Sequence, residues 1–135
     1  SNPSSGEFQD RLIDGRPLYE LVAEKVVEWG NMSMDGAYSN VGAVVGATYP
    51  EMSKILRKLM PHTYFLVPGY GAQGAGAKDA QFAFDRMGHG AAILAGRSIL
   101  YAYQKQDGDG QDYQQAALAA AEKMKKQILS YITVM

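Results

Sequence analysis

The strongest constraint on the fold is an alternation of short apolar runs with amphipathic segments. The runs are VGAVVG, TYFLV and GAAILAG, at residues 41–46, 63–67 and 90–96. A short apolar run without polar alternation is typical of a strand that is covered on both faces, as in a parallel sheet. Because a helical pattern follows each run, the sequence predicts parallel strands joined by right-handed helical crossovers.

Helical patterns surround and separate these strands, at residues 17–29, 50–60, 77–88, 97–103 and 111–132. In the first helix, apolar residues recur at spacings of three and four; they are Leu18, Val22, Val26 and Trp29. Thr48 is placed to cap the second helix, and Gly88 to end the third. The predicted fold class is α/β, and the parallel strands form either a small open sheet or part of a closed barrel.

Charge and composition exclude several classes of partner. The chain has 135 residues, enough for one domain over 1–135. Its 13 basic and 14 acidic side chains form no block of like charge, so neither nucleic acid nor an anionic membrane is an expected partner. Without cysteine there is no disulfide or thiolate chemistry, and two histidines alone cannot build a metal site.

The ends and the apolar runs of the chain bear on its location. No run approaches the roughly 20 apolar residues of a membrane helix, and no basic-then-apolar signal leads the chain. We therefore expect a cytoplasmic protein. The chain begins SNPSSGEF, without an initiator methionine, and we expect a piece of a longer protein.

The glycine-rich loop after TYFLV contains Gly69, Gly71 and Gly74 in the spacing G-x-G-x-x-G. In a dinucleotide-binding fold the helix begins within this motif, and an acidic residue follows about 20 residues later. Here the chain stays irregular to Gly76, and the next strand ends without an acidic residue. The loop is therefore a poor match to a dinucleotide site.

A phosphate site accounts better for the ends of the last two strands. The loop after TYFLV offers backbone N–H groups and the side chain of Gln73, and the next strand leads into Gly96, Arg97 and Ser98. Amides at a helix N-terminus and a guanidinium bind a phosphate dianion. Barrel enzymes form such a site after strands 7 and 8, which fits if these are the last two strands of a barrel. On the residues alone, an arginine after a buried strand is more often a surface residue, and a glutamine in an exposed glycine loop is ordinarily a loop residue, so Arg97 and Gln73 could be no more than that.

A more specific pattern is spread along the chain, in SNPSSGEFQD, PLYELVAEKVVEWG, VGAVVGATYPEM, MPHTYFLVPGYGAQG and HGAAILAGRSILYAY. In order and spacing, these segments resemble the C-terminal half of orotidine 5′-phosphate decarboxylase, in the bacterial subgroup with longer insertions. That family is a (β/α)8 TIM barrel that converts orotidine monophosphate to UMP and CO2 in pyrimidine biosynthesis, without a metal or organic cofactor. The resemblance implies the C-terminal portion of such a barrel, about strands 6–8 with their helices.

The resemblance also implies roles for residues in both loops. Gln73, Gly96 and Arg97 would bind the substrate phosphate. The loop that closes over the substrate would contain Pro68, Gly69, Tyr70 and Gly71, and the pyrimidine side would be approached by Ser1 or Asn2. The subgroup usually has two serines before the arginine where this chain has Ala95-Gly96, a difference that leaves the arginine in place.

The rest of the family's site has no counterpart here. Its catalytic aspartate–lysine array lies on and around strand 3, which no part of this chain matches. We therefore expect no catalytic residue in this chain and no decarboxylase activity from the chain alone. The expected partners are orotidine monophosphate or UMP, the N-terminal half of the barrel and, for the full enzyme, a second copy in a homodimer.

Two alternative functions follow from the same features. A non-catalytic, phosphate-binding half barrel could serve as a subunit or persist as a remnant. Barrel enzymes acting on ribulose phosphates share the phosphate site, but they do not explain TYFLVPGYGAQG or SNPSSGEFQ.

Overall fold

A parallel sheet of short strands lies at the centre of the chain. The computed structural model describes residues 3–71, 74–105 and 110–132. The strands of the sheet are β5 (Ala43–Val44), β6 (Phe65–Val67) and β7 (Ala91–Ile93), in the order β5-β6-β7. Phe65 lies opposite both Ala43 and Ala91, in parallel register on each side. The predicted parallel pairing is confirmed, although each strand is shorter than its apolar run.

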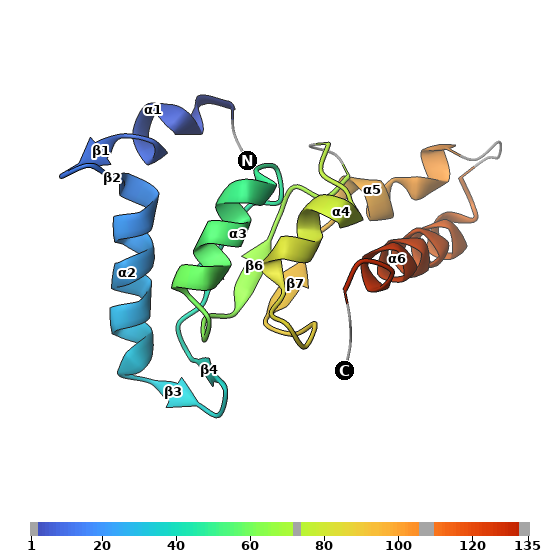
Figure 1. Cartoon of the computed structure of the whole chain (residues 1–135). Helices are drawn as coiled ribbons and strands as arrows, with labels where there is room; N and C mark the ends of the chain where they lie inside the picture. The colour runs from blue at the N-terminus through green and yellow to red at the C-terminus, as the bar shows by residue number, and fades with distance from the viewer. Residues whose placement is uncertain (1–2, 72–73, 106–109, 133–135) are drawn as a thin grey trace.

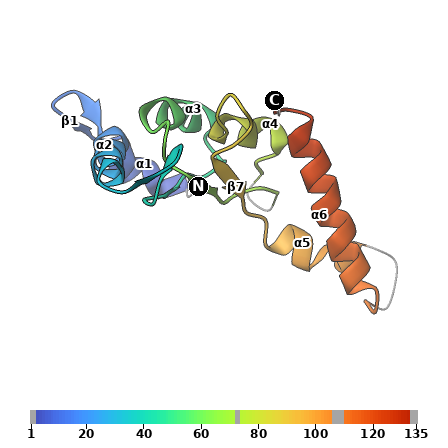
Figure 2. The same ribbon diagram turned by 90° about the horizontal axis from the view of Figure 1, so that it is seen from below.

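Helices follow each strand. The α-helices after the N-terminal segment are α2 (Leu18–Asn31), α3 (Pro50–Leu59), α4 (Ala77–Ala80), α5 (Arg97–Leu100) and α6 (Tyr113–Leu129). Short 3₁₀ helices are η1 (Pro3–Ser5), η2 (Gln81–Ala83) and η3 (Ala102–Lys105). In Figures 1 and 2, α3 and α4 lie on one side of the sheet, while α2 and α6 lie at opposite ends of the molecule. Among the described helices, none is long and apolar enough to cross a membrane.

The N-terminal segment and the loop after α2 contain small elements that the apolar pattern does not predict. They are α1 (Gly6–Gln9), the hairpin of β1 (Leu12–Ile13) with β2 (Arg16–Pro17), and the hairpin of β3 (Met34–Asp35) with β4 (Tyr38–Ser39). The turn of the first hairpin is Asp14-Gly15, and Asp35-Gly36 leads into the turn of the second, with φ of 79° at Gly15 and 62° at Gly36. Asp-Gly is a common hairpin signal because glycine adopts positive φ without strain.

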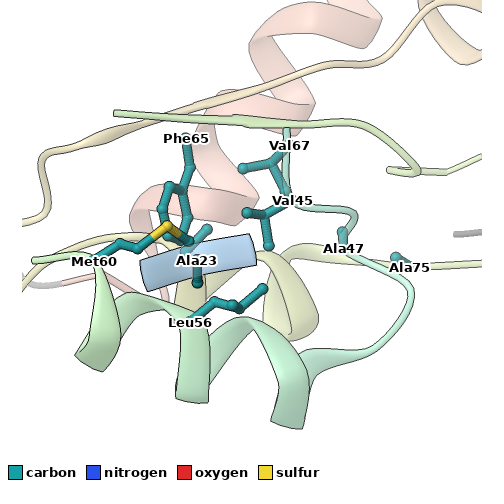
Figure 3. Packing of buried hydrophobic residues seen from close by; sticks show 9 residues of the cluster. Ala23, Val45, Ala47, Leu56, Met60, Phe65, Val67 and Ala75 are labelled. Atoms are coloured by element: carbon teal, nitrogen blue, oxygen red, sulfur yellow. The ribbon is translucent and has the colours of Figure 1, made fainter. Parts of the chain in front are cut away.

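The core lies between the sheet and the helices on one face. Phe65 and Val67 are fully buried, whereas Leu66 between them remains 44% exposed. Figure 3 shows Phe65 and Val67 with Leu56 and Met60 of the α3 segment and Ala23 of α2. The expectation of strands covered on both faces is therefore wrong for the described chain: successive residues of a strand point to opposite faces, and helices cover one of them.

The third predicted helix, 77–88, stops early. After η2 the chain becomes extended at Phe84, with φ of −81° and ψ of 156°. The Asp85 carboxylate then accepts hydrogen bonds from the Met87 and His89 amides, at 2.8 and 2.9 Å. These side-chain bonds replace helical ones, so Gly88, at φ of 77°, lies in a loop and does not end a helix.

Two further helix predictions also need correction. Thr48 does not cap α3, because the residue before the helix is Tyr49 and no side chain caps it. The Thr48 hydroxyl is instead buried without a hydrogen-bond partner among the described residues. On α2, Val22 and Trp29 are 53% and 50% exposed, because the residues that the helix buries are Ala23 and Gly30.

Candidate phosphate-binding site

The loops that follow the strands leave the same edge of the sheet and stay side by side. Beyond the strand ends, the Ala47 amide donates to the Pro68 carbonyl at 2.9 Å, and the Leu94 amide donates to the Val67 carbonyl at 2.9 Å. Pro68 therefore lies beside the loop that follows β5. Because all three strands are parallel, this edge is formed by their carboxyl ends.

The glycine-rich loop after β6 is closed by its own backbone. Gly69, Gly71 and Gly74 have φ of 104°, 78° and 87°, a region that glycine adopts without steric cost. The Gly71 amide donates to the Ala75 carbonyl at 2.8 Å, and the Gly74 amide donates to the Gly71 carbonyl at 3.0 Å. Ala75 is buried in the core and anchors the end of the loop. Gln73 lies outside the described residues.

The segment after β7 turns into α5 at Gly96. The Gly96 carbonyl accepts the amides of Ile99 and Leu100, at 3.0 and 2.9 Å, which closes the first turn of α5. The Arg97 and Ser98 amides donate to no described residue. Arg97 is exposed, and its guanidinium has neither a hydrogen bond nor an ion pair with the described part of the chain.

The two loops meet at Gly71 and Ser98. A Cβ atom added to Gly71 would lie 3.1 Å from Ser98 Oγ and 3.2 Å from Ser98 Cβ. A glycine at this position thus permits the loop after β6 to approach the start of α5 closely. The contact brings the glycine-rich loop next to the residue that follows Arg97.

Tyr70 turns from the glycine-rich loop toward the C-terminal helix. Its hydroxyl donates to Gln127 Oε1 on α6 at 3.0 Å, and partial burial raises the pKa of Tyr70. The predicted pyrimidine-side residues, Ser1 and Asn2, lie outside the described residues. Of the two predicted loops, the contact that the described structure shows is that of Gly71 with Ser98.

A hollow lies between α2, β5 and α3, and Pro68 is among the residues around it. Its volume is about 390 Å³. The described residues around it include Val22, Ala43, Val44, Met52 and Leu56, and no lysine or arginine is among them. An apolar hollow without a cation is not an anion site, so this hollow is not a candidate for the predicted phosphate site.

Comparison with known proteins gives the relationship of the chain. No protein-family profile matches it. Orotidine 5′-phosphate decarboxylase of Rhodopirellula baltica is 44% identical over 133 residues, which is 95% of this chain. The enzyme of the same name from Caldicellulosiruptor bescii is 41% identical over 134 residues, or 98% of the chain. The chain is a homologue of part of orotidine 5′-phosphate decarboxylase. It covers only 44% and 43% of these two relatives, less than half of each.

Solved structures agree with this relationship to orotidine 5′-phosphate decarboxylase. The structure of Leishmania donovani UMP synthase matches with a TM-score of 0.71 and 34% identity, over 95% of this chain and 26% of its own length. Leishmania donovani OMP decarboxylase matches with a TM-score of 0.69 and 32% identity, over 94% of this chain and 45% of its own. The described sheet and helices are thus part of a TIM barrel, which confirms the predicted fold class over the open sheet.

Membership of a barrel also explains where the two loops lie. In barrels of this type, active sites are built from the loops at the carboxyl ends of the strands. Gly71, Arg97 and Ser98 all lie at that end. The contact that sequence analysis of this orotidine 5′-phosphate decarboxylase homologue missed is that of Tyr70 with Gln127, because 57 residues separate the two and no local pattern links them.

Proposed function

We propose that this chain supplies the phosphate-binding part of an orotidine 5′-phosphate decarboxylase, which converts orotidine monophosphate to UMP and CO2. One observation carries the proposal: the glycine-rich loop contacts Ser98, the residue that follows Arg97 at the start of α5. The relatives that carry the name of that enzyme match nearly the whole length of this chain. Their shared name supports orotidine monophosphate as the substrate, and the contact supports this position for its phosphate.

The chemistry of Arg97 suits a phosphate dianion. Since no described carboxylate pairs with it, its planar donors are available to a ligand without breaking an internal ion pair. A charge-assisted bond from such a fork to phosphate is roughly twice as strong as a neutral hydrogen bond. In this proposal Arg97, Gln73 and the Gly96 amide bind the phosphate.

The remaining site residues take positions around that phosphate. We place the loop of Pro68, Gly69, Tyr70 and Gly71 over the ligand, and Ser1 or Asn2 near its pyrimidine. The aspartate–lysine array that performs the chemistry belongs, in this proposal, to the rest of a single barrel domain. The chain therefore contributes binding energy that acts on the reaction only when the complete site is assembled.

The outer strands of the described sheet, β5 and β7, each have one unpaired side that could receive the rest of the barrel. β5 and β7 each pair with β6 and with no other described strand. Val44 on β5 is 72% exposed, and Val22 beside it on α2 is 53% exposed. Open strand edges and uncovered apolar side chains recruit further strands. We propose that the N-terminal half of the barrel pairs at these edges and that the full enzyme is a homodimer; a monodisperse monomer of this chain in light scattering would count against it.

Turnover of orotidine monophosphate tests the proposal directly. Release of CO2 is measured for the purified chain alone and for the chain mixed with the N-terminal half of a relative. We expect no turnover from the chain alone and measurable turnover from the mixture. Turnover by the chain alone would overturn the assignment of the chemistry to the other half, and a non-catalytic subunit would bind UMP without gaining activity.

A pair of arginine variants tests the phosphate site. Arg97→Ala is compared with Arg86→Ala, because Arg86 is also exposed and without a described partner but lies in the loop before β7, at the opposite edge of the sheet. Both changes remove one positive charge, so a general electrostatic effect appears in both. We expect Arg97→Ala alone to lower UMP affinity, and kcat/KM in the assembled enzyme, by more than about tenfold, or about 1.4 kcal/mol. A smaller effect rejects Arg97 as a phosphate ligand.

A further inference from the structure

The hydrogen bond between Tyr70 and Gln127 joins the glycine-rich loop to the C-terminal helix. The Tyr70 hydroxyl lies 3.0 Å from Gln127 Oε1. Tyr70 is half-buried, and it forms an isolated parallel bridge with Ala75 at the other end of the loop. The side chain that contacts α6 therefore belongs to Tyr70, which pairs with Ala75 across the glycine-rich loop.

Movement of Tyr70 would be passed on to the contact between the two loops. Tyr70 is flanked by Gly69 and Gly71, which both have positive φ and so set the direction of the residue between them. Gly71 donates its amide to Ala75 and lies against Ser98. The position of the loop beside α5 thus depends on where the ring of Tyr70 is held.

The C-terminal helix is itself fixed to the same region. α6 packs against α4 and α5, the elements that follow the two loops. Ile128, next to Gln127, is only 9% exposed and fixes the rotation of the helix. Gln127 is therefore presented to Tyr70 by a helix whose own position is determined by buried contacts.

We propose that Gln127 is a positioning residue for the phosphate site, which acts by holding Tyr70 and, through it, Gly71 against Ser98 beside Arg97. The inference rests on the proposed phosphate site for its functional meaning. Gln127 itself need not touch the ligand, because its effect is transmitted by the loop. It also assigns a role to the C-terminal helix, which otherwise only packs against its neighbours.

A double-mutant cycle on UMP affinity tests the coupling. The variants Tyr70→Phe, Gln127→Ala and the double variant are compared by calorimetry, with Gln115→Ala as the control. Gln115 lies on the same helix, is exposed and has no described partner, so its change removes the same side chain from the same kind of position. We expect each test variant to weaken affinity about threefold to fivefold, with the double variant no weaker than either single one. Multiplicative losses, or equal effects of Gln127→Ala and Gln115→Ala, would overturn the proposal.

A measurement without ligand separates this inference from the proposed function. Amide hydrogen exchange of Gly71 reports on its bond to Ala75, and it is measured in the 135-residue chain. We expect faster exchange at Gly71 in Tyr70→Phe and Gln127→Ala, unchanged exchange in Gln115→Ala, and unchanged exchange in the buried strand β6. Equal exchange at Gly71 in all variants, or no protection in the parent chain, contradicts the proposal. If Arg97→Ala leaves UMP affinity unchanged, the phosphate site fails while this measurement still decides the role of Gln127.

Discussion

Two arginines have opposite surroundings: Arg57 lies at the edge of the sheet where the strands begin, and Arg97 lies at the edge where they end. Arg57 on α3 is only 9% exposed, and its guanidinium donates to backbone carbonyls at 2.8–3.0 Å. The acceptors are the carbonyls of Met60, Thr63, Ala83 and Gly90. Arg97 at the carboxyl ends of the strands is exposed and has no partner among the described residues. One arginine is committed to the fold, and the other remains available to a ligand.

The difference follows from what each edge of the sheet contains. Burial lowers the pKa of Arg57, but the carbonyls and the ring of Phe65, 3.7 Å from its guanidinium, stabilise the charged form. The edge where β6 and β7 begin is therefore stabilised by the hydrogen bonds of a buried side chain. The opposite edge is built from glycine-rich backbone and an exposed cation. This division, with stability at one end of a barrel and ligand contacts at the other, is typical of TIM barrels.

The largest predicted effect is the loss of Arg57. In Arg57→Ala the Met60 and Gly90 carbonyls keep a second donor, the Thr63 and Phe65 amides, but Ala83 and Thr63 lose the only donor described for their carbonyls. Each unsatisfied buried acceptor costs about 1–3 kcal/mol, so we expect a loss of about 3 kcal/mol in the free energy of unfolding. Urea denaturation measures it.

Replacement by lysine refines this prediction. Arg57→Lys keeps the charge but cannot supply the planar fork, so we expect an intermediate loss. If Arg57→Ala unfolds at the same urea concentration as the parent chain, the two edges of the sheet do not differ in the way described.

The sequence could predict much of the architecture but not the hydrogen-bond network of Arg57. The apolar runs predicted β5, β6 and β7 as parallel strands, and the spacing of apolar residues predicted α2, α3 and α6 within a few residues. The partners of Arg57 are backbone carbonyls, which every residue has, so no pattern of side chains marks them. The same network explains the wrong helix prediction over 77–88, because the Ala83 carbonyl accepts the hydrogen bond of Arg57 Nε instead of one from a later helical amide, and the chain becomes extended at Phe84.

The candidate site was predictable to a similar degree. Arg97 and the glycines follow strands directly, so their place at one edge was evident from their order. The contact of Gly71 with Ser98 depends on backbone conformation at positive φ, and the bond of Tyr70 to Gln127 depends on the packing of a distant helix. Neither is encoded in local spacing.

The second prediction compares two glycines of the glycine-rich loop after β6. Gly71 and Gly74 both have positive φ, but only Gly71 has a neighbour, Ser98, within 4 Å of an added Cβ atom. We expect Gly74→Ala to cost about 1 kcal/mol of unfolding free energy from backbone strain, and Gly71→Ala to cost about 2 kcal/mol because Ser98 must also move. Thermal unfolding measures both. UMP affinity should fall only in Gly71→Ala; equal losses would show that the two loops are not coupled at this contact.

The third prediction concerns Asp85, which lies before β7, at the same edge of the sheet as Arg57. Partial burial opposes ionisation of Asp85, but hydrogen bonds from the Tyr38 hydroxyl and from the His89 and Met87 amides outweigh it and lower the pKa of the carboxyl. The pKa of Tyr38 is raised to about 12 by burial and by this bond, so its hydroxyl remains a donor at neutral pH. A lowered pKa in the folded state gives stability above the ordinary aspartate pKa, and that stability is lost as pH falls through the folded value.

Tyr38→Phe should therefore destabilise the chain in a pH-dependent way. We expect a loss of about 1 kcal/mol at pH 7, since the pair is only partly buried, and a smaller loss below about pH 4 as Asp85 becomes protonated. Tyr64→Phe is the control, because its hydroxyl makes only a long bond of 3.4 Å to the Ala91 carbonyl. Urea denaturation across this pH range measures both, and a Tyr38→Phe loss that does not change with pH would exclude the carboxylate as the source of the effect.

The smallest predicted effect on stability is that of Arg97→Ala, and it is the sharpest test of the comparison. Because Arg97 has no described partner, its removal leaves no unsatisfied group, and the free energy of unfolding should change by less than about 0.5 kcal/mol. A ligand that binds only the folded state raises its stability by mass action, so UMP should stabilise the parent chain and Arg86→Ala but not Arg97→Ala. Thermal unfolding with and without UMP measures both effects in one experiment. A loss above about 1 kcal/mol without ligand would mean that Arg97, like Arg57, is held by the fold, and the contrast between a structural and a ligand-binding edge would no longer rest on these two side chains.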